Sequence, residues 1–460
     1  MDNKARIKTE RIFKRVLSDI KPTKKETAAT VAHINEVMAR LKRIVKHDVD
    51  VRVVGSIARG TNMRGYADID IFLLFNKKSK KDYIVKYGLQ YGRKLASGKN
   101  DKFEIKYAEH PYVRIWLDEL GIKIDLVPAL KIENASERGT AVDRSPLHNE
   151  FINAHLNVVQ RDETRIFKYL LKAHGIYGAE VKTGGFPGYL CELLIHQFGS
   201  LIKTLEFFST AHTPIMLNPD TKELLKDESL VKKFSSNFIV IDPVDPDRNV
   251  AAGVSETSLA RFILVSRMFL KKPEMGVFYG QGFSSPSSKT LVEQFIKQTG
   301  SDLYLLELPV SEKSEDVIWP QLRKSAGIIS NMLQRYGYQA YMSTVWVKKR
   351  KGYMLFAVFD SKVPAILRKG PEVFMYKAAE DFIGSHKKPL ATMVKDSTLY
   401  LMETNPYPTT ALFFKGITSG KLLGSKRNDV IFKGSHLYEN KMPKKVYLDA
   451  YSEILKKITI

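Results

Sequence analysis

The chain has 460 residues, 44% of them hydrophobic, which is enough for two to four domains with packed cores. A formal net charge of +23 predicts a polyanionic partner, and nucleic acid is the default choice. The alternative is a lysine-rich surface that binds no polyanion. The single cysteine, Cys191, excludes an intrachain disulfide, and no apolar run reaches the roughly 18 residues of a membrane span. With a polar N-terminus, these features predict a cytoplasmic protein without membrane contact.

The first 143 residues have the pattern of an α+β domain. Apolar residues at helical spacing cover 5–20 and 23–47, and another helix is expected near 81–97. Strands are expected at 50–54, 68–75, 103–109, 112–118 and 121–127. These elements predict a small mixed sheet flanked by helices.

The most informative segment of the chain runs from Gly55 to Phe75. A Gly-Ser turn opens a short helix, whose free N–H groups suit a triphosphate. Asp68 and Asp70 then lie at i and i+2 of an apolar strand, so their carboxylates point to one side. Like charges held together require a cation, and two Mg²⁺ ions would satisfy them. The plainer alternative is an acidic pair in a surface turn.

A third carboxylate, Asp125, lies in the alternating strand at 121–127. A lone aspartate in an apolar strand is costly to bury, and a metal shared with Asp68 and Asp70 removes that cost. We expect one ion to be bridged by all three carboxylates and a second to be held by Asp68 and Asp70. The sequence therefore predicts nucleotidyl transfer by in-line attack on an α-phosphorus, with release of pyrophosphate.

A helical pattern begins at Leu147 and extends to about residue 208. The segment from Arg165 to His174 is one helix, and Pro187 stands near the start of a second, largely buried helix. Prolines around Asp242 to Val250 are expected to disfavour regular structure there. These features predict a helical central domain at 144–256, after the catalytic domain at 1–143; a role of the central domain in nucleotide recognition is implied only by the resemblance described below.

The remaining residues, 257–460, mix strands and helices. The order strand, helix, strand, strand, helix, strand is expected over 303–308, 317–336, 339–346, 353–359, 377–384 and 398–402. It indicates a ferredoxin-like or RNA-recognition-like module, with a tail module at about 309–388. The basic hairpin tip Lys348 to Gly352 either contacts phosphates or is simply solvated.

These motifs resemble the archaeal-type CCA-adding enzymes, which are tRNA nucleotidyltransferases. The resemblance extends over the whole chain and rests, beyond the Gly-Ser and Asp-x-Asp motifs, on the segments 168–180, 185–193 and 242–252. It implies an α+β multidomain fold with a nucleotidyltransferase catalytic head, a helical central domain and an α+β C-terminal RNA-binding body and tail.

The activity that the resemblance implies is template-independent addition and repair of the 3′-terminal CCA of tRNA from CTP and ATP. The implied cofactor is Mg²⁺, as two ions. The implied partners are the acceptor stem, 3′ end and elbow of tRNA, the two nucleotides, and a second copy of the chain in a homodimer.

The resemblance also assigns roles to residues. Asp68, Asp70 and Asp125 match the catalytic, metal-binding carboxylates, with aspartate at position 68 where many archaeal members have glutamate. The residues that match contacts to ATP or CTP are Ser56, Arg59, Ser145, His148, Lys168, Tyr177 and Arg248. The last of these matches an arginine that reads the base edge together with the tRNA backbone.

Plainer interpretations remain for four of these residues and for the chain as a whole. They are a solvated Lys168, a Tyr177 that caps the core, a His148 that only starts a helix, and an Arg248 that pairs with Asp245 or Asp247. A poly(A) polymerase or oligoadenylate synthetase shares the Gly-Ser and Asp-x-Asp motifs. A small-molecule nucleotidyltransferase shares the catalytic core but needs no basic C-terminal region, and a non-catalytic RNA-binding protein needs no third carboxylate.

Overall fold

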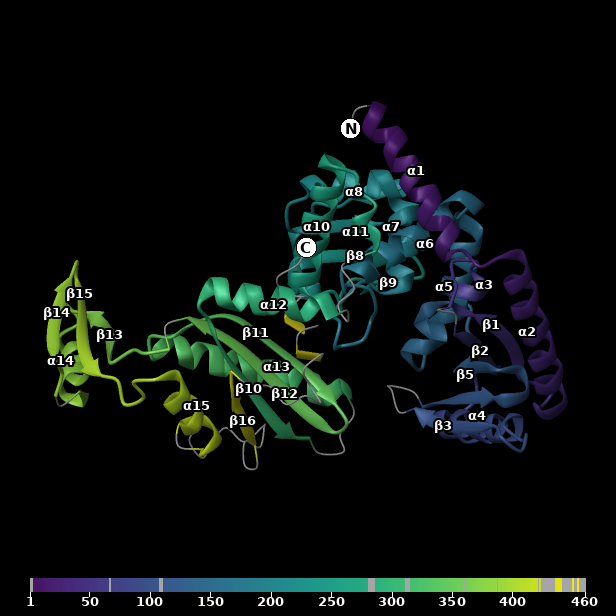
Figure 1. Ribbon diagram of the computed structural model, residues 1–460. Coiled ribbons are helices and arrows are strands. Elements are labelled where there is room, and N and C mark those ends of the chain that lie inside the picture. Colours follow the sequence, from purple (N-terminus) through teal and green to yellow (C-terminus); the bar gives the residue numbers. More distant parts are fainter. Residues whose placement is uncertain are drawn as a thin grey trace. The chain divides into compact units, whose positions relative to one another are not determined.

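The protein is described here from a computed structural model that covers most of the chain. The described residues are 3–65, 68–106, 111–279, 286–310, 315–359, 361–386, 388–420, 422, 435–440, 449–450 and 453–454. The chain divides into two compact units, one formed by 1–179 and 183–280 and the other by 180–182 and 281–460. Figure 1 shows the elements of both units.

The first unit contains a five-stranded mixed sheet with the strand order β1-β2-β5-β4-β3 (Figure 1). Its strands are β1 (Asp50–Val54), β2 (Ile69–Phe75), β3 (Lys102–Lys106), β4 (Tyr112–Leu117) and β5 (Ile122–Leu130). β2 and β5 run parallel, and the other neighbours run antiparallel. The predicted strands are all present, with ends shifted by up to three residues; residues 107–109 of the third lie outside the described residues.

The two faces of this sheet differ because side chains alternate along a strand. On one face, Ile71 and Ile124 belong to a core that is shared with helices α2 (Lys24–Ile44) and α4 (Lys81–Leu95). The opposite face carries Asp70 on β2 and Asp125 on β5, and we call it the carboxylate face. Further along the same strands this face carries a smaller buried apolar cluster that includes Phe72 and Val127, so the polar part of the face is the end near Asp70 and Asp125.

The rest of the first unit is mainly helical. Its helices are α1 (Asn3–Ile20), α5 (Ser145–His155), α6 (Val158–Ala173), α7 (Gly188–Phe198), α8 (Leu201–Thr210), α9 (Glu228–Phe234), α10 (Glu256–Lys271) and α11 (Gly276–Tyr279). A small sheet of order β7-β6-β8-β9 is formed by β6 (Ile215–Asn218), β7 (Glu223–Leu224), β8 (Phe238–Asp242) and β9 (Asp245–Asn249). The apolar side chains of α1, α6, α7, α8 and α10 form one core.

Three features of this unit differ from the sequence expectations. Helix α1 packs with the central helices, through Ile12 and Val16, and not with the first sheet. Helix α10 lies beyond the expected boundary at 256, yet Phe262 belongs to the same core, so the division falls nearer residue 280. The segment expected to be irregular is a β-hairpin, β8–β9, because Pro246 lies on an edge strand that needs no partner for its missing N–H.

The second unit has a four-stranded antiparallel sheet of order β11-β12-β10-β16. In chain order its elements are β10 (Asp302–Pro309), α13 (Glu315–Arg335), β11 (Gln339–Lys348), β12 (Lys351–Phe359), α15 (Thr410–Thr418) and β16 (His436–Glu439). This βαββαβ order is the expected ferredoxin-like arrangement. One sheet face packs on α13 and α15, and the other is covered by α12 (Pro286–Thr299) together with Ala450 and Ile454.

A separate three-stranded sheet interrupts this arrangement between β12 and α15. Its strands are β13 (Ala365–Glu372), β14 (Ala391–Lys395) and β15 (Thr398–Thr404), and helix α14 (Tyr376–Ser385) lies between the first two in the chain. The expected fifth and sixth elements, at 377–384 and 398–402, therefore belong to this insert, and α15 and β16 take their places. The expected tail limits of 309–388 cut across both sheets.

The expected basic hairpin tip is present between β11 and β12. Lys349 and Arg350 form its two-residue turn, both with positive φ angles of 46° and 60°. Among the residues described, no helix combines the length and apolar character needed to cross a membrane.

Candidate active site

The Gly-Ser turn directly adjoins the carboxylates. Val54, the last residue of β1, lies opposite Asp70 in the antiparallel register with β2, and Gly55 then opens the four-residue helix α3 (Gly55–Ala58). Gly55 has a φ of +82°, and a Cβ atom on it would lie 2.1 Å from Oδ2 of Asp70. Only glycine satisfies both constraints. Ser56 follows within α3, on the chain segment that borders the carboxylates.

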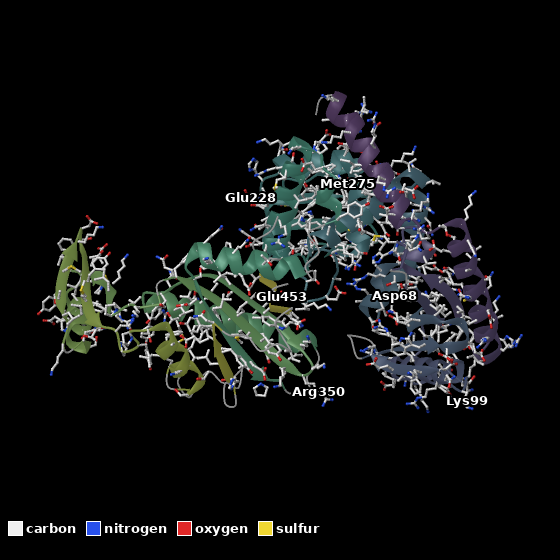
Figure 2. The ribbon with its side chains drawn as sticks, in the orientation of Figure 1. Asp68, Lys99, Glu228, Met275, Arg350 and Glu453 are labelled. Atoms are coloured by element: carbon white, nitrogen blue, oxygen red, sulfur yellow. The ribbon has the colours of Figure 1, made fainter. Side chains whose placement is uncertain are left out.

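Asp70 and Asp125 lie directly opposite each other in the parallel register of β2 and β5. Arg114, the partner of Asp125 on β4, binds it with both ends of its guanidinium, with Nε–Oδ1 and Nη2–Oδ2 distances of 2.7 Å. Asp68 precedes β2 and pairs with Lys123, with an Nζ–Oδ1 distance of 2.6 Å. The structure thus places Asp70 opposite Asp125 and Asp68 just before the same strand, and two basic side chains bind Asp125 and Asp68. Figure 2 labels Asp68.

Asp70 is the carboxylate without a strong counter-charge of its own. Burial raises its pKa to about 7, and the nearby charges of Asp125 and Asp68 add to the effect. No three His, Cys, Asp or Glu side chains are gathered closely enough to hold a metal ion in the described part of the chain. The chemistry of this face still suits a hard divalent cation, because Asp70 lies directly opposite Asp125 and a cation would relieve the buried charge of Asp70. To bind such a cation, Asp125 and Asp68 would have to turn oxygens towards it that now pair with Arg114 and Lys123.

A second cluster surrounds Glu192 on α7, whose side chain is fully buried. Its carboxylate lies 2.8 Å from Nε of Arg59 and 3.0 Å from Nζ of Lys168, and it accepts a hydrogen bond from Thr61 at 2.5 Å. Burial acts to raise the pKa of Glu192, but the charges of Arg59 and Lys168 outweigh it and bring the pKa to about 2. An ionised glutamate therefore joins the segment after the Gly-Ser turn to helices α6 and α7.

Lys168 and Tyr177 meet at the start of α7. A Cβ atom on Gly188 would lie 3.2 Å from the Tyr177 hydroxyl and 3.5 Å from Nζ of Lys168. The interpretation of Lys168 as a solvated helix lysine is wrong, because the side chain is almost entirely buried against Glu192. The ion pair with Glu192 does not identify a ligand of Lys168, so the contact of Lys168 with the nucleotide stays a prediction.

A third cluster is built on Asp242, the fully buried last residue of β8. His148 Nε2 and Arg248 Nη1 each lie 2.8 Å from its Oδ2, and the Tyr189 hydroxyl donates to Oδ1 at 3.2 Å. Burial acts to raise the pKa of Asp242, but the hydrogen bonds and charges of His148 and Arg248 bring it to about 2. The rings of His148 and Tyr189 stack, with centroids 4.0 Å apart. Burial lowers the pKa of His148.

The interpretation that Arg248 pairs with Asp245 or Asp247 is also wrong, because both aspartates have other partners. Asp245 is buried and pairs with Arg144 and Arg138, while Asp247 pairs with Lys233. Arg248 pairs with Asp242 and keeps about a third of its side chain exposed. Ser145 opens α5, three residues before His148 on the same helix.

Arg59 connects the three clusters. Besides its ion pair with Glu192, it donates to Asn149, the neighbour of His148, at 3.3 Å. Its charge also acts on the pKa of both Asp70 and His148. The predicted residues from the two parts of this unit therefore share one electrostatic environment, on elements that the structure places together.

Sequence reasoning missed the acidic partners Glu192 and Asp242 and the basic partner Arg114. A signal existed for Glu192, which is the single charged residue in the apolar helix Gly188–Phe198 apart from a histidine. Asp242 ends the apolar strand β8, and Asp70 lies near the start of the apolar strand β2. A lone carboxylate in an apolar element indicates a buried partner, and this reasoning was applied only to Asp125.

Comparison with known families gives three successive matches. Residues 34–148 match the model of a nucleotidyltransferase domain, residues 162–279 that of a tRNA nucleotidyltransferase second domain, and residues 300–437 that of a CCA-adding enzyme C-terminal domain. Nucleotidyltransferase domains of this kind generally use divalent metal ions. Among solved structures, the Cid1 poly(U) polymerase is similar with a TM-score of 0.49 and 13% identity, covering 59% of this chain and 98% of that one.

Similar proteins are found in several archaea. The CCA-adding enzyme of Methanocaldococcus jannaschii is 35% identical over 421 residues, which cover 90% of this chain and 91% of that protein. The enzyme of Sulfurisphaera tokodaii is 35% identical over 336 residues, covering 73% of this chain and 75% of that protein. The resemblance seen in the sequence is confirmed: the chain belongs to the family of CCA-adding enzymes.

Proposed function

We propose that this protein adds the 3′-terminal CCA to tRNA from CTP and ATP, by nucleotidyl transfer that releases pyrophosphate. The observation that carries the proposal is the register of Asp70 opposite Asp125 beside the Gly55 turn, in a chain that matches CCA-adding enzymes over most of its length. We also propose that the protein acts in the cytoplasm and that it forms a homodimer, as the resemblance to its family implies.

Asp68, Asp70 and Asp125 are the proposed ligands of two Mg²⁺ ions. Such ions would polarise the α-phosphate and lower the pKa of the RNA 3′-hydroxyl. Arg114 and Lys123 hold the outer carboxylates in place, at 2.7 Å and 2.6 Å, and neutralise part of their charge. The sheet therefore presents oxygen ligands from adjacent strands at fixed spacing, which is the positioning that phosphoryl chemistry needs.

Arg59, Lys168, Ser56, Ser145 and Tyr177 are the proposed contacts to the nucleotide's phosphates and sugar. Glu192 supports this role, because its buried carboxylate pairs with both Arg59 and Lys168 and so fixes the orientation of these two side chains beside the Gly-Ser turn. A cation that is already oriented loses little side-chain entropy when it binds a phosphate.

Asp242 organises the proposed base-recognition group. It holds His148 and Arg248 by hydrogen bonds of 2.8 Å, so the exposed part of the Arg248 guanidinium points in a set direction. Guanidinium donors can bind acceptors on the edge of cytosine or adenine. We propose that Arg248 reads the incoming base together with the RNA, while Asp242 fixes its position.

The proposed macromolecular partner is tRNA, bound through its acceptor stem, 3′ end and elbow. The net charge of +23 supports contacts to phosphates, and such contacts recognise an RNA helix by its shape. The hairpin tip at Lys349 and Arg350 is one proposed contact, since both side chains are exposed on a turn that non-glycine residues adopt at a cost.

The experiment compares Asp70→Asn and Asp125→Asn with wild type on a tRNA transcript that lacks CCA. Each variant should lose at least about a hundredfold in nucleotide incorporation, because several kcal/mol of charge stabilisation depend on the carboxylates. tRNA binding, measured by filter retention, should persist. Asp82→Asn, at an exposed site in the first turn of α4, is the matched control and should be fully active. A variant of Asp70 that keeps more than a tenth of the activity would contradict the proposal.

A further inference from the structure

An exposed tryptophan lies on the carboxylate face, two residues after Arg114 on β4. Side chains at i and i+2 of a strand share a face, so Trp116 lies on the same side as the Arg114–Asp125 pair. Its neighbours Ile115 and Leu117 are buried on the helix-covered face. Trp116 itself is 37% exposed. A tryptophan this exposed leaves much apolar surface in water, which its neighbours in the core do not.

Two lysines flank Trp116 across the sheet. Lys102 on β3 and Lys123 on β5 are its direct partners in the antiparallel registers. Lys123 also reaches Asp68, so the flanking row adjoins the catalytic carboxylates. Directly opposed residues have Cβ atoms about 5 Å apart, so the three side chains form a continuous surface. We call the surface of Lys102, Trp116 and Lys123 the Trp116 platform.

The composition of this platform suits one class of ligand. An indole ring stacks on a nucleobase of any sequence, and adjacent ammonium groups attract the phosphates on either side. A free nucleotide would already be held by the groups around Lys168 and Arg248, which come from other elements. An RNA end must bring its hydroxyl to Asp70 and Asp125, and its last unpaired nucleotides therefore pass close to these carboxylates.

We propose that the Trp116 platform binds an unpaired nucleotide at the 3′ end of the RNA substrate by stacking on its base. This inference rests on the proposed function and names how that site holds its acceptor. The terminal base changes at each step of a CCA addition. Stacking tolerates that change, whereas a base-specific hydrogen bond does not. The platform thus holds successive acceptor ends without selecting among them.

The chain offers a matched control in Phe103 on β3. It is an aromatic residue of comparable exposure, 45%, but it lies on the opposite face of the same sheet, where Arg93 stacks over its ring. Replacing either residue by alanine removes an exposed aromatic side chain from the same sheet. Only the change at Trp116 removes one from the carboxylate face.

The experiment measures the Kd of full-length Trp116→Ala, Trp116→Phe and Phe103→Ala for a tRNA with an unpaired 3′ nucleotide. The platform predicts that Trp116→Ala raises the Kd by ~5- to 150-fold, the range for one stacked base, and that phenylalanine recovers most of the loss. Phe103→Ala should bind as wild type does. For a blunt RNA duplex, Trp116→Ala and wild type should bind equally.

A second measurement uses tryptophan fluorescence and does not depend on a stable alanine variant. The other two tryptophans, Trp319 and Trp346, belong to the second unit, so wild type minus Trp116→Phe isolates the signal of Trp116. Adding the RNA should quench this difference signal. An unquenched signal would overturn the platform, as would equal weakening by Trp116→Ala and Phe103→Ala.

The two proposals can fail separately. If wild type incorporates no cytidylate into tRNA but Trp116→Ala still weakens binding of the RNA end, the proposed function fails and the platform stands. If wild type completes CCA and Trp116→Ala binds the RNA end unchanged, the platform alone is refuted.

Discussion

Replacing the buried Glu192 by glutamine should destabilise the first unit strongly. Glu192 is fully buried between Arg59 and Lys168, at 2.8 and 3.0 Å, and the substitution leaves both cations without their carboxylate. Breaking a buried ion pair by removing one partner costs about 3–5 kcal/mol. The pKa gives a second route to this figure, because a fall from 4.5 to about 2 corresponds to ~3 kcal/mol of differential interaction.

The assay is calorimetric unfolding of the full chain. With about 2–4 °C per kcal/mol for domains of 150–250 residues, the transition of the first unit should fall by roughly 10 °C. The contribution of Glu192 also depends on pH in a set direction. Because its folded pKa is depressed, the contribution is complete above the unfolded pKa of 4.5 and is lost as the pH falls towards 2. The difference between wild type and variant should therefore shrink below about pH 4.5.

Glu150→Gln is the control for the chemical change itself. Glu150 pairs with Arg52 at 2.9 Å, but its side chain is 61% exposed, so the loss should be below about 1 kcal/mol. If Glu192→Gln unfolds at the same temperature as wild type, or no lower than Glu150→Gln, the claim that Glu192 anchors Arg59 and Lys168 is refuted.

Three further predictions concern the turn, the base-recognition group and the RNA. Gly55→Ala should nearly abolish nucleotide incorporation, because the new Cβ atom would lie 2.1 Å from Oδ2 of Asp70. Gly121→Ala is the control: its backbone strain is similar, but its Cβ atom would lie in open space, so the variant should stay active. Equal losses of activity in a primer-extension assay would contradict this prediction. Asp242→Asn should reduce CTP-over-ATP selection at the first step more than it reduces overall kcat, since it loosens Arg248; unchanged selectivity in competition assays would count against it. Affinity for tRNA should fall by at least about a thousandfold between 50 and 200 mM salt if six or more phosphates are contacted, and a flat response in titrations would exclude the basic surface as the RNA site.

The strands of the first sheet could be predicted from the sequence because alternation is a local pattern. Alternation in β2 and β5 places Asp70 and Asp125 on one face, and the Gly-Ser turn marks the end of β1. What the patterns lacked was the identity of partners that are distant in the sequence. Nothing local to Arg59 indicates Glu192, which is more than a hundred residues away, and nothing local to His148 indicates Asp242.

The arrangement of the second unit shows the same limit. The six strands and helices that were expected there lie close to their expected places, because periodicity is a local property, but α12, β13, β14, α15 and β16 were not expected. The sheet that a strand joins depends on non-local pairing, so β15 was assigned to the ferredoxin-like arrangement that β16 completes. In the first unit, an apolar stripe on α1 did not reveal which core would bury it, and it packs with the central helices.

The central claim is tested most directly by the mass of the product formed on a tRNA transcript without its CCA. With CTP alone, the product should gain two cytidylates and stop, and ATP supplied afterwards should add a single adenylate. Adenylate tails made from ATP alone, or no growth with CTP, would contradict the account.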